Sequence, residues 1–265
     1  MKTVLSVAGS DCSGGAGIQA DLKTIGAFGL YGMSAVTAIT VQNTCGVTRT
    51  EPVSAGLVEE QMRAVFEDIR PDAVKIGMVA DSGNVRAIVS VLKDYPTEAV
   101  LDPVMVSTSG RELLDQEAVA VLTEELFPLV TVITPNLPEA ERLFGSRISC
   151  EVEREQAAKW LAQEYGCSVL IKGGHAAAGA DDLLYHRESG RKIWYRGERT
   201  VSANTHGTGC TLSTAIACGL ARGKTLEDSV RQAKQYVAGA IREGLDLGRG
   251  NGPLDHFYQR RVEEQ

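Results

Sequence analysis

The stretch Asn204-Thr-His-Gly-Thr-Gly-Cys-Thr-Leu-Ser213 is the point around which the chain is organised. It follows a polar segment and opens an apolar run, residues 212–220, that is typical of a helix. Gly207 and Gly209 carry no side chain, so the backbone there can approach a ligand closely. Because N–H groups at a helix start are unpaired and lie at the positive end of the helix dipole, the turn suits a phosphate or a developing negative charge. A plain glycine turn capped by Thr211 also explains these residues, since short glycine motifs match by chance.

Around this stretch, short apolar segments alternate with helical ones. Buried strands are predicted at residues 3–8, 33–41, 73–76, 99–101, 130–133 and 169–171, an edge strand or flap at 47–53, and a hairpin at 182–186 with 192–195. Helices are predicted at residues 18–28, 58–69, 82–92, 116–126, 137–144, 151–165, about 211–220 and 226–245. The alternation predicts an α/β fold with a mostly parallel sheet and helices on both faces. No linker or repeat interrupts it, so we expect residues 1–265 to form a single domain.

The composition narrows the class of protein. The formal net charge is −7 without a basic cluster, which argues against a nucleic-acid partner. No apolar run approaches membrane-spanning length, and the first residues enter a strand and then glycines, so neither a membrane segment nor a signal peptide is expected. None of the six cysteines forms a C-x-x-C pair and the four histidines are scattered, as in a reduced cytoplasmic protein without zinc.

The first predicted strand leads into a second glycine-rich loop, residues 9–17, and then a helix. Gly9 and Gly14 have the spacing of a Walker loop, but the lysine that grips phosphate is absent. Residues 15–20 match the dinucleotide fingerprint formally, but the acidic residue that should follow about twenty positions later for the ribose is absent. The order of elements therefore suits a nucleotide site, while neither motif has the chemistry.

Polar residues gather where the predicted strands end. In open parallel sheets, ligands bind beyond the carboxyl ends of the strands. Turn chemistry explains each of these residues singly, but it explains the set less well because all would lie along one edge. They are residues 9–11, Gln42, Asp102, Asn136 and Lys172.

Two carboxylates near these ends are candidate metal ligands. Asn136 is a good N-cap and Pro138 suits the first turn, so helix capping accounts for Asn136. It leaves Glu139 open, and we favour Mg²⁺ there, held directly or through water, as a phosphoryl-transfer site needs. Asp102 precedes a proline and is either a turn residue or a second carboxylate near the metal or phosphates.

Lys172 and Cys210 are the other candidates. Lys172 precedes two glycines, which would leave room for a nucleotide, and its ammonium would neutralise charge on a transferring phosphate. A cysteine early in a helix is often only a small buried residue. A helix N-terminus also lowers the pKa of a thiol, which makes Cys210 a possible base or nucleophile.

Stretches that run nearly from end to end resemble the ribokinase superfamily, and within it the hydroxymethylpyrimidine/phosphomethylpyrimidine kinases of thiamine biosynthesis. The matching stretches are Ala8-Gly-Ser-Asp11, Ser13-Gly-Gly-Ala-Gly-Ile-Gln-Ala-Asp-Leu-Lys23, Gln42-Asn-Thr-Cys-Gly46, Lys75-Ile-Gly-Met78, Leu101-Asp-Pro-Val104, Ile133-Thr-Pro-Asn-Leu-Pro-Glu-Ala140, Lys172-Gly-Gly-His175 and the central Asn204–Ser213 stretch.

The resemblance implies a three-layer α/β/α ribokinase-like fold, ATP and Mg²⁺ as cofactors, and a homodimer. The family phosphorylates the pyrimidine alcohol and then its monophosphate. By match to the family pattern, the pyrimidine pocket is lined by Gly9, Asp21, Gln42, Met78, Val104 and Cys210. The nucleotide and metal side is formed by Asp102, Asn136, Glu139, Lys172 and Thr208, and the turn of Gly207, Thr208, Gly209 and Cys210 is the anion hole. The wider superfamily usually has aspartate in place of Cys210, so the identity of the base stays open.

Gln42 is expected to read the substrate ring. A glutamine amide presents an acceptor and donors side by side, which complement the ring nitrogen and amino group of an aminopyrimidine. Pyridoxine lacks that amino group, so a site built to hydrogen-bond the amino group should reject pyridoxine. A glutamine that only satisfies turn backbone groups is the other explanation.

Three other functions stay open. A pyridoxine kinase of the same branch is the nearest, and Gln42-Asn43-Thr44 argues for the pyrimidine enzymes. A dinucleotide-dependent oxidoreductase lacks its ribose acid. A non-catalytic nucleotide-binding module would not need Glu139, Lys172 and Cys210 together.

Overall fold

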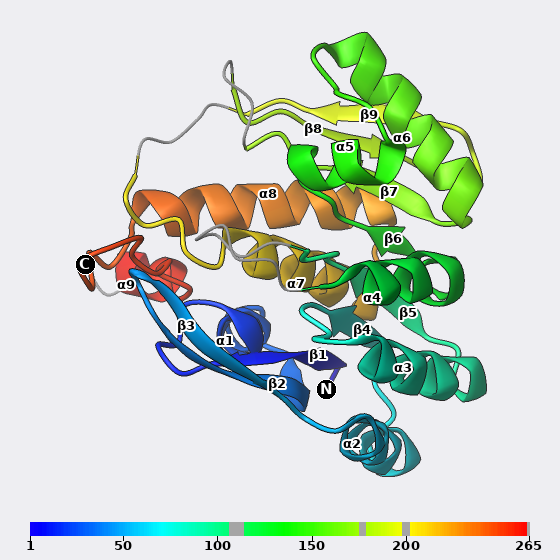
Figure 1. Cartoon of the computed structure of the whole chain (residues 1–265). Coiled ribbons are helices and arrows are strands. Elements are labelled where there is room, and N and C mark those ends of the chain that lie inside the picture. The colour runs from blue at the N-terminus through cyan, green and yellow to red at the C-terminus, as the bar shows by residue number, and fades with distance from the viewer. Residues whose placement is uncertain (106–113, 175–178, 198–201, 264–265) are drawn as a thin grey trace.

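The computed structural model describes residues 1–105, 114–174, 179–197 and 202–263, and its elements form a three-layer arrangement (Figure 1). His175, the last residue of the quoted Lys172–His175 stretch, lies outside the described residues. The described strands make one nine-stranded sheet in the order β3-β2-β1-β4-β5-β6-β7-β8-β9.

The middle of the sheet is parallel and its two borders are antiparallel. The parallel strands are β2 (Tyr31–Asn43), β1 (Thr3–Asp11), β4 (Ala73–Ile76), β5 (Glu98–Leu101), β6 (Val132–Ile133) and β7 (Ser168–Ile171). The antiparallel borders are β3 (Gly46–Pro52) on one side and β8 (Asp182–Tyr185) with β9 (Lys192–Tyr195) on the other. The mostly parallel sheet, the edge strand near residues 47–53 and the hairpin are confirmed.

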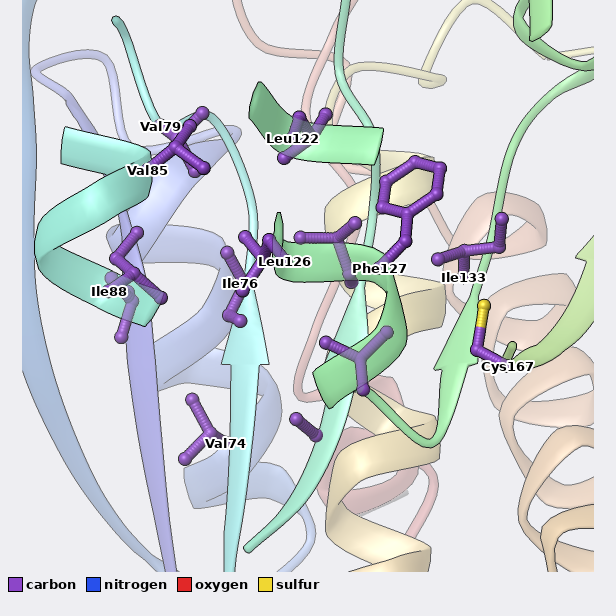
Figure 2. Packing of buried hydrophobic residues seen from close by; sticks show 14 of the residues in the cluster. Val74, Ile76, Val79, Val85, Ile88, Leu122, Leu126, Phe127, Ile133 and Cys167 are labelled. Atoms are coloured by element: carbon purple, nitrogen blue, oxygen red, sulfur yellow. The ribbon is translucent and has the colours of Figure 1, made fainter. Parts of the chain in front are cut away.

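Helices cover both faces, and each face has its own apolar core. One core joins α1 (Gly17–Ala27), α7 (Thr208–Ala221) and α8 (Leu226–Arg242) to the sheet. The other joins α2 (Ala55–Asp68), α3 (Ser82–Asp94), α4 (Gln116–Val121), α5 (Leu137–Phe144) and α6 (Glu151–Tyr165). In the second core, side chains of β4 such as Ile76 pack between helix residues such as Ile88 and Leu126 (Figure 2). A last helix, α9 (Tyr258–Glu263), ends the described chain.

Strands of near-continuous apolar residues form this sheet because both of its faces are buried. β4 and β7 are buried along their whole length. Helix starts follow capping chemistry: Asp81 accepts from the N–H of Asn84 before α3, and Thr225 accepts from the N–H of Asp228 before α8.

The boundaries differ from the expected ones at two places that matter for the site. β1 continues to Asp11, with a shift in the β1–β2 register between Ala8 and Ser10. α7 begins at Thr208 with Gly207 as its N-cap, so the helix starts earlier than residue 211. The capping role considered for Thr211 is wrong, because its hydroxyl instead lies 3.1 Å from His256 Nε2.

Elsewhere, the helix expected over 116–126 is a short α4 followed by a π-helical turn, Leu122–Leu126, and a 3-10 turn, Phe127–Leu129. The strand expected from residue 130 starts at Val132. Within the described part of the chain, every helix is too short or too polar to span a lipid bilayer.

Candidate active site

An ion pair stands at the carboxyl ends of the central strands. Asp102 follows β5 and Lys172 follows β7, and Lys172 Nζ lies 2.7 Å from Asp102 Oδ1. Asn136, which follows β6, bridges to Lys172 through the backbone. The Lys172 side chain is 13% exposed and that of Asp102 is 3% exposed. Three of the predicted strand-end residues therefore meet along one edge of the sheet.

Glu139 joins this ion pair from the start of α5. Its carboxylate accepts from the N–H of Asn136 at 2.8 Å, and Asn136 Oδ1 accepts from the N–H of Glu139 at 2.9 Å, so the two residues form a capping box. Burial raises the pKa of Glu139 to about 7, with Asp102 adding to the rise while Lys172 and hydrogen bonds from the backbone of Asn136 and Met105 oppose it. The capping interaction is thus present, and the metal role of Glu139 stays a prediction.

The residues fit a magnesium ion only in part. Mg²⁺ keeps several waters in most sites and uses one or two carboxylates with substrate phosphates. The described residues contain no group of three or more His, Cys, Asp or Glu side chains that would hold a metal unaided. Asp102 and Glu139 both interact with the ammonium of Lys172, and Lys75 also acts on Asp102. The raised pKa of Glu139 shows that a second negative charge is unfavourable there, and a hydrated cation would offset it.

The start of α7 lies against the Asp102–Lys172 pair. A Cβ atom on Gly209 would lie 3.0 Å from Asp102 Oδ2 and 3.3 Å from Lys172 Nζ. A side chain at position 209 would press on both groups, so the first turn of α7 lies in direct contact with the lysine–aspartate pair. The hydroxyl of Thr208 donates to the carbonyl of Thr205 at 2.7 Å and holds the turn.

Gly207 has a different reason to be glycine than the one expected. Its φ is +82°, and a Cβ there would lie 1.9 Å from the carbonyl oxygen of Gly15. The close neighbour is therefore the loop of residues 9–17 and not a ligand. This loop packs against the central stretch, which explains why both segments are rich in glycine although neither is a Walker or dinucleotide motif.

Cys210 is half-buried in the first turn of α7. Burial raises the pKa of its thiol and the carboxylates of Asp21 and Asp102 add to the rise, while Lys75 opposes it. The pKa is therefore raised and not lowered as expected at a helix N-terminus, because the loss of solvation is its largest cause. The thiol is therefore a neutral group at neutral pH.

Asp21 is buried near Cys210, and both of its carboxylate oxygens already have hydrogen-bond partners. Both oxygens accept from Lys75 Nζ, at 2.9 and 2.7 Å, and hydroxyls of Ser6 and Thr214 donate at 2.6 and 2.7 Å. Its exposed fraction is 0%. The substrate contact expected for Asp21 stays a prediction, and in this structure the residue links α7 to β1 and β4.

Other residues predicted for the pocket lie at the ends of neighbouring strands. A Cβ on Gly9 would lie 3.5 Å from Met78 Sδ, so β1 and the segment after β4 meet there. Thr37 donates to the carbonyl of Met78 at 2.6 Å. Val104 is half-buried in the turn after β5, where its N–H donates to the carbonyl of Asp102 at 2.8 Å. Their contacts with a substrate stay a prediction.

The sequence placed Asp11 only among the polar residues 9–11 at a strand end and gave His206 no role of its own. Asp11 accepts from the N–H groups of Ser13, Gly15 and Ala16, and its Oδ2 lies 2.9 Å from His206 Nε2. Burial pushes the pKa of Asp11 upward, but hydrogen bonds from His206, Ser13 and Ala16 outweigh it and lower the value to about 2.

The same His206 nitrogen lies 2.9 Å from the side-chain amide nitrogen of Gln42. Asp11 and His206 were both inside quoted stretches, but 195 positions separate them, and nothing local indicates the pair. Lys75, in the quoted Lys75–Met78 stretch, was missed in the same way.

Comparison with known proteins gives consistent results. A family model described as phosphomethylpyrimidine kinase matches residues 11–255. The chain is 49% identical to a hydroxymethylpyrimidine/phosphomethylpyrimidine kinase of Rhizobium meliloti, over 96% of this chain and 97% of that protein. It is 47% identical to the thiamine biosynthesis bifunctional protein ThiED of Geobacter sulfurreducens; this match covers 96% of the chain but only 52% of that longer protein. Among solved structures, pyridoxal kinase from Staphylococcus aureus in complex with ADP superposes with a TM-score of 0.90 at 33% identity, over 99% of this chain and 96% of that one.

Proposed function

The chain belongs to the phosphomethylpyrimidine kinase family, and from this premise we propose that it phosphorylates 4-amino-5-hydroxymethyl-2-methylpyrimidine to the monophosphate and then to the diphosphate in thiamine biosynthesis. It is an ATP-dependent kinase with a ribokinase-like fold. The observation that carries the proposal is the convergence of Lys172, Asp102 and the N-terminus of α7 at the carboxyl ends of the strands. A pyridoxine or pyridoxal kinase is the second candidate, favoured by the similarity to the Staphylococcus aureus enzyme.

The proposed reaction is an in-line transfer. ATP lies along the sheet edge near Asn136 and Lys172, and the hydroxymethyl oxygen attacks the γ-phosphorus near Cys210. The Lys172 ammonium and the N–H groups of residues 207–210 hold the equatorial oxygens as charge develops on them. Fixed donors of this kind are worth more in a water-poor site than in bulk water, because they need no reorganisation during the reaction.

Mg²⁺ is proposed as the metal that accompanies ATP, with Glu139 and Asp102 on its side of the site. When bound, it supplies charge neutralisation on the phosphates. The carboxylate of Glu139 is already bonded to backbone N–H groups, so it would hold the metal through a water and not directly.

Cys210 is proposed to accept a hydrogen bond at its sulfur from the attacking alcohol and so to position that oxygen. A thiol with a raised pKa is neutral at neutral pH and does not take up a proton, so the alcohol proton moves late in the transfer to an oxygen of the phosphoryl group. Phosphoryl transfer depends mainly on positioning and charge neutralisation, so no strong base is required. In the second step the acceptor is a phosphate oxygen, which already carries charge and needs no base.

We also propose that the protein is a homodimer in the cytoplasm and a single domain over residues 1–265. Ile39 and Val41, on the outer face of β2, are 56% and 52% exposed next to the edge strand β3, an apolar surface suited to a second copy. All six cysteines are free, which agrees with a reducing compartment.

An ATP-consumption assay with three acceptors tests the function. The pyrimidine alcohol, its monophosphate and pyridoxine are each offered to the purified protein with Mg²⁺ and ATP, and products are identified by mass. We expect turnover of the first two and slower turnover of pyridoxine. Faster turnover of pyridoxine would select the second candidate, and no turnover of any acceptor would contradict both.

A further inference from the structure

One ring nitrogen of His206 faces two side chains at once. Nε2 lies 2.9 Å from Asp11 Oδ2 and 2.9 Å from the amide nitrogen of Gln42, while Gln42 Oε1 lies 3.3 Å from the hydroxyl of Thr40. His206, Asp11 and Thr40 are 6%, 2% and 5% exposed, so water does not readily replace a missing partner. The proton on Nε2 therefore decides how the whole group is bonded.

Asp11 requires that proton to be on Nε2. The carboxylate already accepts from three backbone N–H groups, so it acts as an ionised acceptor and has no hydrogen to give the ring. A bare ring nitrogen at 2.9 Å would place two lone pairs against each other. His206 therefore donates to Asp11 through Nε2–H.

A ring N–H and an amide NH₂ group cannot hydrogen-bond to each other, because both are donors. A half-turn of the Gln42 amide about its Cγ–Cδ bond exchanges oxygen and nitrogen, which are nearly equal in size. The oxygen then accepts from His206 Nε2–H, shared with Asp11. The nitrogen donates to the Thr40 hydroxyl, which itself donates to the carbonyl of Ser10 at 2.9 Å. In this orientation His206 Nε2–H, one amide N–H of Gln42 and the Thr40 hydroxyl each face an acceptor, and the second amide N–H is left for a ligand.

We propose that His206, held by Asp11, fixes the orientation of the Gln42 amide and thereby the order of acceptor and donor that the pocket offers to the substrate ring. The inference rests on the proposed function, because it takes Gln42 to contact the acceptor substrate. His206 acts through Gln42 and is a positioning residue. An aminopyrimidine carries its ring nitrogen and amino group in one fixed order, so a turned amide would set donor against donor. Pyridoxine, which offers only a ring nitrogen next to carbon substituents, depends less on that order.

Two substitutions with the same number of bonds from Cβ isolate the effect. Gln carries an N–H group about where Nε2 of His206 lies, and Met carries a methyl group there. His206→Met should lower kcat/KM for the pyrimidine alcohol by about tenfold, as expected for one misdirected hydrogen bond, mainly through KM. The value for pyridoxine should fall much less, and the KM for ATP should stay near that of the wild type. His206→Gln should restore most of the preference.

The kinetic result would overturn the proposal if both alcohols lost the same factor in His206→Met, or if His206→Gln behaved like His206→Met. Equal losses would show that His206 only holds the two loops together. Thermal unfolding of each variant identifies a general loss of structure, which would lower the turnover of both alcohols alike.

A spectrum of the wild-type protein tests the same assignment without any substrate. Long-range ¹H–¹⁵N correlation shows which of the two ring nitrogens of a histidine carries hydrogen. The signals that disappear in His206→Gln belong to His206. We expect hydrogen on Nε2. A neutral ring with hydrogen only on Nδ1 would overturn the proposal. If the protein phosphorylates neither alcohol, the proposed function fails, and the spectrum still decides the position of the proton.

Discussion

Two buried lysine–aspartate pairs lie near Cys210, and they differ in how completely their charges are satisfied. In the sealed pair, Lys75–Asp21, both side chains are 0% exposed and hydroxyls of Ser6 and Thr214 complete the carboxylate. In the open pair, Lys172–Asp102, the lysine is 13% exposed. The open pair also has Glu139 as a second carboxylate and the N-terminus of α7 beside it.

The difference indicates which pair stabilises the fold and which pair is placed to take part in the reaction. A charge whose hydrogen-bonding groups are all used inside the protein has nothing left to offer a ligand. The sealed pair therefore ties α1, β4 and α7 together, and its lysine keeps its proton because Asp21 offsets the lowering of the pKa by burial. The open pair places a partly exposed lysine beside a carboxylate of raised pKa at the edge of the sheet, and perturbed ionisable groups of this kind cluster at functional sites.

The largest effect should come from breaking the sealed pair. Lys75→Met leaves the carboxylate of Asp21 buried without its cation, which typically costs about 3–5 kcal/mol of unfolding free energy. Denaturant unfolding at constant pH measures this loss. The double variant Lys75→Met with Asp21→Asn should recover a large part of it, because no lone charge remains. Equal stability of the single and double variants would mean that packing of Lys75, and not its charge, is what matters.

Glu139 gives the open pair a dependence of stability on pH. Its pKa rises from 4.5 to about 7 on folding, so the folded state binds the proton more tightly than the unfolded state does. The stabilisation is present below about pH 4.5 and is lost as the pH rises to about 7. Glu139→Gln keeps the cap and removes the ionisation, so it should be more stable than the wild type at pH 8 by up to about 3 kcal/mol relative to their difference at pH 5. Unfolding in EDTA measures it; parallel stability curves for the two proteins would show that Glu139 titrates normally.

Cys210 lies near both pairs, and its substitution tests whether it belongs to the open site or only to the packing around the sealed pair. If it positions the acceptor oxygen of the open site, Cys210→Ala should lower kcat by about 10²-fold, the scale for a misplaced reacting atom. ATP binding should be nearly intact. Cys210→Asp, which carries the residue usual in the wider superfamily, should retain part of the activity if the pocket tolerates the charge. Normal turnover by the alanine variant would assign Cys210 to packing alone.

The metal requirement should show the smallest change. Glu139→Gln removes a charge near the metal but keeps an oxygen, so it should raise the Mg²⁺ concentration for half-maximal rate by about tenfold. Thr225→Ala, which removes a helix cap on α8, is a control without a link to the site. An unchanged Mg²⁺ titration would leave Glu139 with its capping role only.

The open pair was predictable from the sequence and the sealed pair was not. Asp102, Asn136 and Lys172 each end a buried strand, and parallel strands bring their carboxyl ends to one edge, so a local pattern sufficed. Asp21 and Lys75 meet by packing across 54 positions, within a helix and a strand whose patterns indicate only burial. Asp21 was assigned to the pocket only through the resemblance to the family. In the structure its carboxylate is buried and hydrogen-bonded inside the protein.

The glycine-rich segments 9–17 and 204–213 were likewise only partly predictable from the sequence. Their glycines indicate close approach, but the sequence does not say to what: Gly209 approaches the open pair, whereas Gly207 approaches the backbone of Gly15. Likewise, the helix dipole that lowers a thiol pKa is a local effect, whereas the burial that raises the pKa of Cys210 depends on the whole fold. Local chemistry thus indicated where the site lies and left its internal partners undetermined.

The central claim is that Lys172 serves phosphoryl transfer whereas Lys75 serves the fold, and one matched measurement tests it. Lys172→Met and Lys75→Met carry the same change, and kcat/KM for the pyrimidine alcohol with Mg²⁺ and ATP is measured for each, divided by the folded fraction in the same buffer. The account predicts a loss of about 10²-fold or more per folded molecule for Lys172→Met, the scale of one lost electrostatic stabiliser, and a much smaller loss for Lys75→Met. Near wild-type turnover per folded molecule in Lys172→Met would contradict it.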